Sequence, residues 1–263
     1  MVKNHMNQEL PEVVSEEVWK KERIELLEKE KAFTKAKDEL NTMRRMLPMV
    51  EVEKDYTFDG PDGKVHLGDL FQGRPQLIVQ HFMFDPEWDA GCPACSLAAD
   101  NIGHLSHLHA RNTSLVLISR APFEKLERYK KRMGWSMPWY SSFESEFNYD
   151  YHATLDEAVR PFEYNYADKE THREKGFVLE EGQSIEVPGF SVFLREGDKI
   201  FHTYSTYARG ADILLGTFNY LDLTAFGRQE DWEKPEGRSD GRGSTWLHRH
   251  DEYSGHEKND CCH

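Results

Sequence analysis

Apolar side chains recur at every seventh position near the start of the chain. Along a highly charged stretch from residue 15 to residue 46 and at the residue after it, they fall at strict sevens: Trp19, Leu26, Phe33, Leu40 and Leu47. This spacing predicts one long helix with a narrow apolar stripe. Because Glu22 and Lys29 occupy the companion heptad positions, the pattern favours docking on a globular body, in the same chain or in a partner, over a free coiled coil.

The apolar pattern then changes from helical to strand-like. Residues 54–70 predict a short β-hairpin around Gly60-Pro61-Asp62-Gly63, and the apolar, branched run 76–84 predicts a buried strand. A helix follows from Pro93 to near Arg111, and residues 113–119 form a second buried run. A strand, a helix and a strand make a βαβ unit, whose right-handed crossover lays the two strands parallel.

The second half of the chain contains less regular stretches between clear elements. Residues 143–187 are rich in Tyr, Asp and Glu with little periodicity, so we expect an insertion packed over the sheet, and residues from 227 onward read as a polar surface tail. The pattern predicts four further elements: a helix over 123–133, a strand over 139–142, a hairpin over 189–207 around Gly197-Asp198, and a last helix over 211–220.

The order of these elements predicts an α/β protein with a thioredoxin-like fold. To that fold the chain adds an N-terminal helical extension, a β-hairpin prefix, an insertion before the C-terminal hairpin and a polar C-terminal tail. We therefore expect a helical arm over 1–49, a thioredoxin-like domain over 50–225 with its insertion at about 143–187, and a tail over 226–263.

Composition narrows the possible functions. The 263 residues include 33 basic and 47 acidic side chains, a formal charge of −14, which argues against nucleic acid or anionic membrane as a partner. No apolar run approaches the ~20 residues that span a bilayer, so we expect a cytoplasmic protein. Four cysteines in a chain of this length are too few for a disulfide scaffold.

The only spaced cysteine pair is Cys92 and Cys95, at the predicted strand-to-helix junction. Gly91 permits a tight bend and Pro93 suits a first helical turn, so Cys92 is expected at a helix N-terminus. Unpaired amides and the helix dipole lower a thiol pKa there, and a pKa near 7 would leave about half of the thiol ionised at neutral pH. The pair can then cycle between dithiol and disulfide.

Three more residues are candidates for supporting roles, each with an ordinary structural alternative. Trp88 would shape a substrate groove beside the cysteines, or fill the core. Arg120 ends a predicted parallel strand, where it would hold a thiolate or an anionic substrate, or cap the next helix. Pro188 precedes a strand that would face the cysteines, which predicts a cis Val187–Pro188 bond near Cys92, unless it is a plain strand-start proline.

Other chemistry finds little support in the sequence. One cysteine pair lacks two of the ligands of tetrahedral zinc, and His104 and His107 share a helix face from which His109 points away, so no metal site is predicted. No phosphate-cradling glycine motif occurs, so no cofactor is expected. Cys261 and Cys262 could be a resolving or metal-binding tail, although adjacent cysteines in a loose terminus are more often inert.

Several segments together resemble a bacterial family of uncharacterised function: DGPDGK, FMFDPEWDAGCPACS, SRAPFEKLERYKKRMGW, FNYDY, HTYSTYARG, YLDLT and RHDEY. That family is described as thioredoxin-like and predicted to contain dithiol-disulfide oxidoreductases. The resemblance runs from about Trp19 to Tyr253 and implies a fold and a reaction class. Unlike thioredoxin, this chain has its tryptophan four residues before Cys92 and has Pro-Ala between the cysteines, which leaves the redox potential and the partner open.

The sequence therefore predicts a thiol-disulfide oxidoreductase that uses Cys92 and Cys95 on a protein or small-molecule disulfide, with a homodimer formed through the N-terminal helix as a further expectation. Two alternatives stay open: a non-catalytic thioredoxin-fold binding module with metal-bound or inert cysteines, and a peroxiredoxin-like thiol peroxidase. The physiological substrate, the electron donor, the redox potential, the oligomeric state and the role of the insertion are not determined by the sequence.

Overall fold

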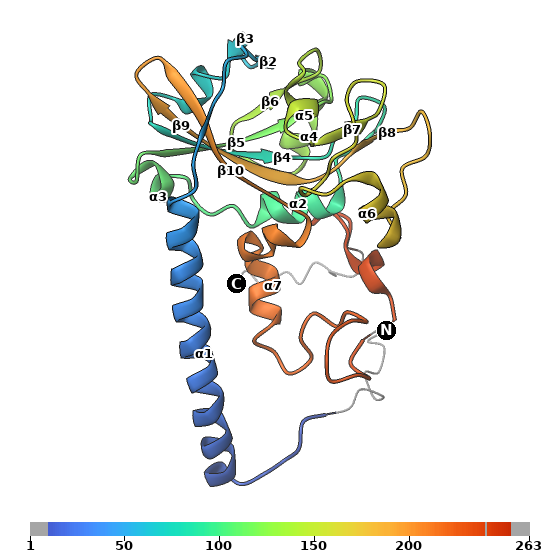
Figure 1. The fold of residues 1–263 in the computed structure, drawn as a ribbon. Helices are drawn as coiled ribbons and strands as arrows, with labels where there is room; N and C mark the ends of the chain where they lie inside the picture. The colour runs from blue at the N-terminus through green and yellow to red at the C-terminus, as the bar shows by residue number, and fades with distance from the viewer. Residues whose placement is uncertain (1–9, 240, 254–263) are drawn as a thin grey trace, which may run out of the picture. The chain divides into compact units, whose positions relative to one another are not determined.

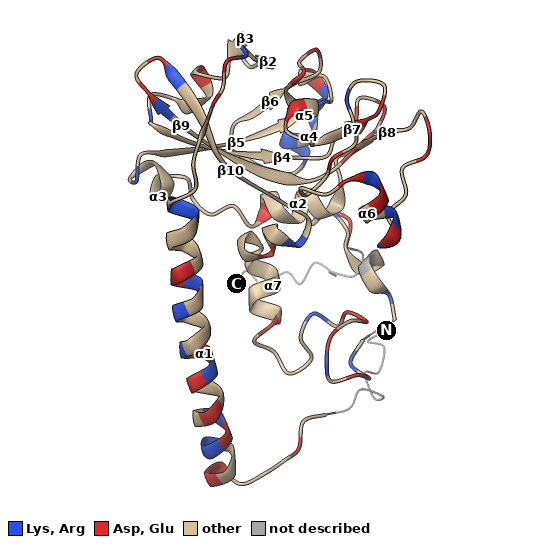
Figure 2. Ribbon diagram, viewed as in Figure 1, with Lys and Arg blue, Asp and Glu red and all other residues tan. Residues whose placement is uncertain are grey.

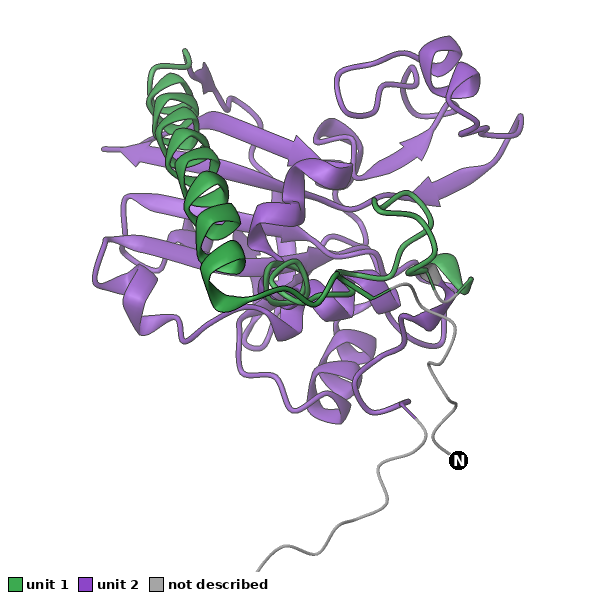
Figure 3. Cartoon of the chain, turned by 90° about the horizontal axis from the view of Figure 1, so that it is seen from below, with its two compact units in different colours: residues 1–48, 218–244 green, residues 49–217, 245–263 purple. Residues whose placement is uncertain are grey.

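The protein is described here by a computed structural model that covers residues 10–239 and 241–253. The chain divides into two compact units (Figure 3). One comprises residues 1–48 and 218–244, and the other comprises residues 49–217 and 245–263. The second unit holds the β-sheet and both spaced cysteines. None of the helices in the described ranges combines the length and apolarity needed to cross a membrane.

The larger unit is built on an eight-stranded mixed sheet (Figure 1) with the strand order β1-β10-β9-β4-β5-β6-β2-β3. Its strands are β1 (Val50–Glu51), β2 (Thr57–Gly60), β3 (Gly63–His66), β4 (Gln76–His81), β5 (Thr113–Ser119), β6 (Trp139–Ser141), β9 (Gly189–Glu196) and β10 (Lys199–Tyr207). β4, β5 and β6 are parallel, whereas β9 runs antiparallel to β4 and to β10. This βαβ unit followed by an antiparallel hairpin is the thioredoxin-like arrangement, and it confirms the predicted fold class.

The predicted strands and hairpins are present, although β4 ends at His81, three residues before the end of the predicted strand 76–84. The β2–β3 hairpin turns between Gly60 and Gly63, and Gly63 has a φ of 109°, which suits a residue without a Cβ. The β9–β10 hairpin turns at Gly197, whose φ is 60°. Both turns demand glycine in the left-handed region, and for this reason the sequence signal was reliable.

Two hydrophobic cores cover the two faces of the sheet. One contains Val79, Val116 and Phe193 from the strands, packed with Phe71 of a short 3-10 helix, η1 (Asp69–Phe71), and with Phe147. On the other face, the helices α2 (Pro93–Asp100) and α4 (Phe123–Arg132) pack against Leu115, Leu117 and Trp139 of the strands and against Phe82 and Phe84, which follow β4. Strand residues alternate between the faces, so each strand serves both cores.

Two predicted helices are shorter than expected. The cysteine helix was predicted to run to about Arg111, but α2 ends at Asp100 because the Asn101 side chain donates to Leu97 O at 2.7 Å and takes over the capping. A separate short helix, α3 (Ser106–His109), follows. The last predicted helix, 211–220, is divided into a 3-10 segment, η2 (Ala208–Leu214), and α7 (Gly216–Leu221).

The region from 143 to 187 contains short elements that periodicity did not reveal. They are α5 (Phe147–Asp150), β7 (Thr154–Asp156), α6 (Lys169–Glu174) and β8 (Ser184–Glu186). β7 and β8 form a separate two-stranded sheet with its own small core. Phe147 and Tyr151 also enter a core of the main sheet, so this stretch contributes to the stability of that sheet.

The smaller unit contains one long helix, α1 (Glu16–Arg45), as predicted from the heptad pattern. The Ser15 hydroxyl accepts from Val18 N at 3.3 Å and caps its first turn. No residue of α1 is buried, and charged residues occur along its length (Figure 2). In the C-terminal part of this unit, Arg228 lies over the Phe218 ring at 4.5 Å and pairs with Asp222 at 2.7 Å. The helix η3 (Gly243–Trp246) lies close to the end of the described chain.

Candidate active site

Cys92 occupies the N-cap position of α2, and Pro93 is the first residue of the helix. The backbone of Cys92 is held at both ends, because its N donates to Met83 O at 3.0 Å and its O accepts from Ser96 N at 2.9 Å. Gly91 lets the backbone before Cys92 pass close to the Phe82 ring, since a Cβ at Gly91 would lie 2.5 Å from Cε1 of Phe82. The strand-to-helix turn therefore fixes the first cysteine at the positive end of the helix dipole.

The surroundings of Cys92 favour its thiolate. A hydrogen bond from the Cys95 thiol lowers the pKa of Cys92 to about 6, helped by the amides of Cys95 and Ala94 and by the charge of Arg249, against the opposing effect of burial. The side chain is only partly buried, and both thiols are free. A thiolate present at neutral pH and reachable by solvent is the reactive form of cysteine.

Cys95 is held as the protonated partner. Its hydrogen bond to Cys92 and its burial raise the pKa of Cys95 well above the ordinary value, and the charge of Glu186 raises it further. The side chain is 2% exposed, and its Sγ accepts from Met83 N at 3.4 Å. The two cysteines are thus chemically unequal: one is a partly buried thiolate, and the other is a fully buried thiol that donates to it.

Arg249 is a residue of this site that sequence reasoning missed. Its Nε and Nη2 donate to Gly91 O at 2.9 Å and 2.7 Å, and its charge lowers the pKa of Cys92. Glu252 pairs with Arg249, and Arg132 of α4 binds Asp251 and Glu252. Residues 249–252 of the predicted polar surface tail are therefore held at Gly91 and on α4 by specific contacts. Arg249 is the first residue of RHDEY, one of the segments that carry the family resemblance. A recognisable motif in a polar tail indicates a constrained position, so this segment was a sequence signal for Arg249.

A shallow groove of about 590 Å³ lies at Cys92. Trp88, Pro93 and Arg249 line it together with Glu87, Asp89 and Ala90. The structure thus brings together three sequence candidates: Cys92, Pro93 and Trp88. Trp88 is 37% exposed, and its carbonyl accepts from Lys125 Nζ at 2.8 Å, which fixes the loop before the cysteines.

Pro188 is not among the residues that line the groove at Cys92. It lines a separate pocket of about 160 Å³ that also contains Cys95. The Val187–Pro188 bond is trans, since Lys234–Pro235 is the only cis bond within the described ranges. The prediction of a cis bond was wrong, because the chain continues in extended form from β8 into β9 and needs no reversal at Pro188. The Pro188 carbonyl accepts from Tyr164 OH at 3.2 Å.

Arg120 follows β5 but contributes to a different cluster. Its Nη1 donates to the buried carboxylate of Glu186 at 3.0 Å, and its guanidinium lies 5.1 Å from the centre of the Tyr149 ring. Glu186 also accepts from Thr154 Oγ1 at 3.0 Å. Burial raises the pKa of Glu186 to about 7, opposed by the charge of Arg120. The partner of Arg120 in this structure is thus the carboxyl group of Glu186 in the same chain, and no sequence pattern indicated Glu186.

A second cluster of buried polar side chains forms a chain of hydrogen bonds across β4, β9 and β10. His81 binds Ser191 Oγ at 2.8 Å, Ser191 binds Ser205 Oγ at 2.7 Å, and Ser205 binds His202 Nε2 at 2.7 Å. Burial and the neighbouring His202 lower the pKa of His81 to about 3. This chain of hydrogen bonds gives His81 Nε2, both serines and His202 partners inside an aromatic core, while His81 Nδ1 has none among the described residues. Both histidines are neutral there at physiological pH.

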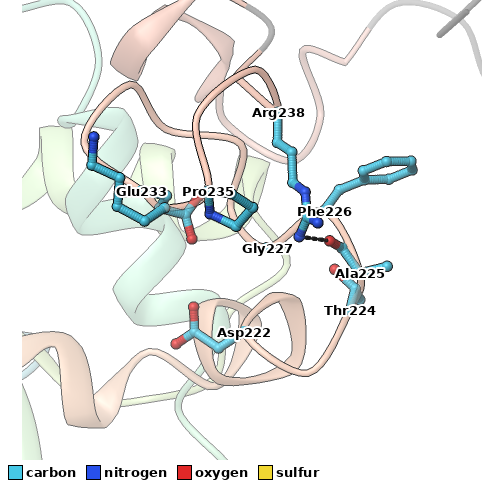
Figure 4. A pocket seen from close by; sticks show the side chains of 9 residues that line it. Asp222, Thr224, Ala225, Phe226, Gly227, Glu233, Pro235 and Arg238 are labelled. Atoms are coloured by element: carbon cyan, nitrogen blue, oxygen red, sulfur yellow. Dashed lines mark hydrogen bonds between the residues drawn. The ribbon is translucent and has the colours of Figure 1, made fainter. Parts of the chain in front are cut away.

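The smaller unit has a pocket of its own, of about 170 Å³ (Figure 4). Its polar groups are engaged within the pocket wall: Arg238 Nη1 donates to Ala225 O at 2.7 Å, and Glu233 accepts from the backbone N of Arg228 and Glu230. We therefore interpret this pocket as part of the internal packing of a folded loop. No three His, Cys, Asp or Glu side chains gather to hold a metal in the part of the chain that the structure describes, and Cys261 and Cys262 lie outside that part.

The model of one protein family matches residues 8–253 of the chain, and its description is "Bacterial protein of unknown function (DUF899)". The chain belongs to this family. The DUF899 match spans the sheet, both spaced cysteines and Arg249. No curated protein matches the chain.

Among solved structures, the DUF899 chain is similar to several peroxiredoxins at low identity. Peroxidoxin BcpB from Mycobacterium tuberculosis is 15% identical, with a TM-score of 0.42, over 66% of this chain and 97% of that chain. A cysteine mutant of PrxQ from Xylella fastidiosa is 8% identical, with a TM-score of 0.40, over 66% of this chain and 94% of that chain. Plasmodium vivax 2-Cys peroxiredoxin is 14% identical, with a TM-score of 0.36, over 67% of this chain and 93% of that chain. Likeness at this level establishes no shared activity.

Proposed function

We propose that this DUF899 protein is a dithiol-disulfide oxidoreductase in which Cys92 is the nucleophile and Cys95 resolves. The Cys92 thiolate attacks one sulfur of a substrate disulfide, that S–S bond breaks, and one substrate thiolate leaves. The Cys95 thiol then loses its proton and attacks the Cys92 sulfur, which releases the second substrate thiol. The substrate gains two electrons, and the protein retains a Cys92–Cys95 disulfide that a reducing thiol must reopen.

One observation carries the proposal: the opposite shifts of two adjacent thiols. The pKa of Cys92 is lowered to about 6 by its hydrogen bond with Cys95, whereas that bond and burial raise the pKa of Cys95. An attacking thiol works best when its pKa lies near the ambient pH, and a resolving thiol must stay protonated until the mixed disulfide forms. The arrangement supplies both conditions.

The open groove at Cys92 supports a substrate that is held from one side, such as a protein or small-molecule disulfide. Trp88 would form its apolar wall and Arg249 its cationic side. The small number of cysteines is compatible with a reducing compartment such as the cytoplasm. Because the sequence contains no cofactor motif, a thiol donor would supply the electrons. These assignments rest on the proposed reaction.

The alkylation rate of Cys92 as a function of pH tests the proposal. With a pKa of about 6, reduced protein should react with iodoacetamide at a half-maximal rate near pH 6 and at about its full rate by pH 7.5. A Cys95 peptide should remain unmodified under the same conditions, as shown by mass mapping. Ordinary cysteine, with a pKa of about 8.5, serves as the reference.

Arg249→Met should move the half-maximal pH of Cys92 alkylation upward, since a positive charge beside the thiolate is lost. Arg111→Met, at an exposed position, is the matched control and should leave it unchanged. A half-maximal rate above pH 8 in the wild type would contradict the proposal. Slow alkylation together with stoichiometric zinc would favour a binding module, and fast consumption of hydrogen peroxide without disulfide reduction would favour a thiol peroxidase.

For the partner of α1, we propose a second copy of the chain, paired antiparallel. Residues 16–30 carry six acidic and four basic side chains, whereas residues 31–45 carry five basic and two acidic, so the two halves attract in that orientation. The 30 residues of α1 reach about 45 Å. The exposed stripe includes Trp19 and Phe33, which are 59% and 70% exposed.

Light scattering on the full chain should then give twice the chain mass. Phe33→Glu should reduce it to the monomer mass, because a charge would enter the apolar seam. Thr42→Glu adds the same single negative charge at an exposed position on the opposite side of the helix and should leave the dimer intact. A wild-type monomer, or equal dissociation by both variants, would argue against pairing through the stripe.

A further inference from the structure

The pocket beside Cys95 has an unusual lining. Its walls come from four separate elements of the larger unit, and most of the side chains are small or apolar: Ala94, Ala98, Pro188, Phe190, Ala211 and Leu215. Ala94 and Ala98 lie one turn apart on α2, so they leave open a strip of that helix surface. The volume of about 160 Å³ is close to that of an apolar cavity that holds one benzene ring.

Two residues of the lining, Gln80 and His81, each have one buried side-chain atom without a hydrogen-bond partner among the described residues: Gln80 Oε1 and His81 Nδ1. Gln80 is 1% exposed, and its Nε2 donates to Cys95 O at 3.2 Å. Its Oε1 is buried and accepts no hydrogen bond from the described residues. A buried amide oxygen without a donor is destabilising, because it has lost its hydrogen bonds to water and gained none in return. Since Gln80 lines the pocket, a ligand in that pocket can supply the missing donor.

The wall opposite α2 is held in place by specific contacts. The Asn101 Oδ1 at the end of α2 accepts from Thr217 N at 2.7 Å, which ties the segment after η2 to that helix. Ala208 begins η2 with a φ of 48°, in the left-handed region, where a residue with a Cβ is strained. The strained backbone carries Ala211 and Leu215 to the pocket instead of allowing β10 to continue.

We infer that this pocket is a binding site for a small, neutral ligand with an apolar part about the size of one aromatic ring and one hydrogen-bond donor. The apolar walls exclude a charged ligand, because an unpaired ion loses its hydration there. The donor would be a hydroxyl or an amide N–H directed at Gln80 Oε1. The site is distinct from the groove at Cys92, which is lined by other residues, and it does not depend on the redox proposal.

Binding of phenol and benzene to the reduced full-length protein tests this inference by calorimetry. Phenol fits the ring-sized space and has one donor, whereas benzene has the ring alone. Phenol should bind about tenfold more tightly, as expected for one net hydrogen bond. Gln80→Met keeps an unbranched side chain of similar length without the amide oxygen, so it should remove the preference and leave benzene binding nearly unchanged.

Ala98→Leu fills the ring-sized space and should weaken both ligands at least tenfold. Ala110→Leu adds the same atoms at an exposed position outside the pocket and should change neither affinity. Circular dichroism on each variant shows whether it is folded. Failure of folded wild type to bind either ligand, or equal phenol affinity in wild type and folded Ala98→Leu, would overturn the inference. Equal affinities for phenol and benzene in the wild type would overturn the role of Gln80.

Discussion

A Cys95→Ser variant should form a stable mixed disulfide between Cys92 and its substrate and lose multiple-turnover reductase activity. Attack needs only the Cys92 thiolate, which retains the helix amides and the charge of Arg249 after the substitution. Resolution needs a thiol within reach of the Cys92 sulfur, and the buried Cys95 is the one that hydrogen-bonds to it. Trapping in a lysate, followed by mass spectrometry of the adducts, measures this outcome and identifies the substrate.

Cys92→Ser should also lose reductase activity but should form no adduct, since the remaining thiol is 2% exposed and has a raised pKa. The double variant Cys261→Ser, Cys262→Ser is the control and should retain full activity. Normal turnover by Cys95→Ser would mean that another thiol resolves, with the terminal pair as the first suspects. Full reductase activity in both single variants would exclude the dithiol mechanism.

Glu186 should make the protein less stable as the pH rises. Its folded pKa of about 7 lies above its ordinary 4.5, so the folded state holds a proton that the unfolded chain has already released. The stabilising contribution is complete below about pH 4.5 and is lost as the pH rises through about 7. It amounts to about 3 kcal/mol, at 1.36 kcal/mol for each pH unit between the two values.

His81 acts in the opposite direction over part of the same range. Its folded pKa of about 3 lies below the ordinary 6.5, so the unfolded chain takes up a proton below about pH 6.5 that the folded state refuses. His81 therefore destabilises the protein as the pH falls from about 6.5 toward 3. The unfolding curve of the wild type alone mixes both effects, and a difference between two variants is needed to separate them.

Urea unfolding of the wild type and Glu186→Gln between pH 4.5 and pH 8 gives that difference. The wild type minus the variant should fall by about 3 kcal/mol across the range, while the contribution of His81 cancels. The loss of the Arg120 partner adds an offset that does not depend on pH here, because arginine stays charged throughout. Glu181→Gln, at an exposed position, should show a flat difference. A difference that rises with pH would mean that Glu186 is ionised at low pH in the folded state.

The sequence by itself determined the elements whose signals are local. The turns at Gly63 and Gly197 need a positive φ, and the buried runs that became β4 and β5 have too many branched apolar residues for a surface. Such signals depend on neighbouring residues alone, so a single sequence carries them. The position of Cys92 at the start of α2 was predicted for the same reason, since Gly91 and Pro93 define that junction locally.

What only the tertiary structure decided depends on partners distant in the chain. The pKa of Cys92 owes part of its shift to Arg249, and the charge of Arg120 is taken up by Glu186. Neither pair has any local pattern, because a contact between remote residues follows from the folding of the whole chain. The predicted end of the cysteine helix was wrong for a related reason. The apolar periodicity continued past Asp100, but the Asn101 side chain folds back onto Leu97 O and the helix ends there.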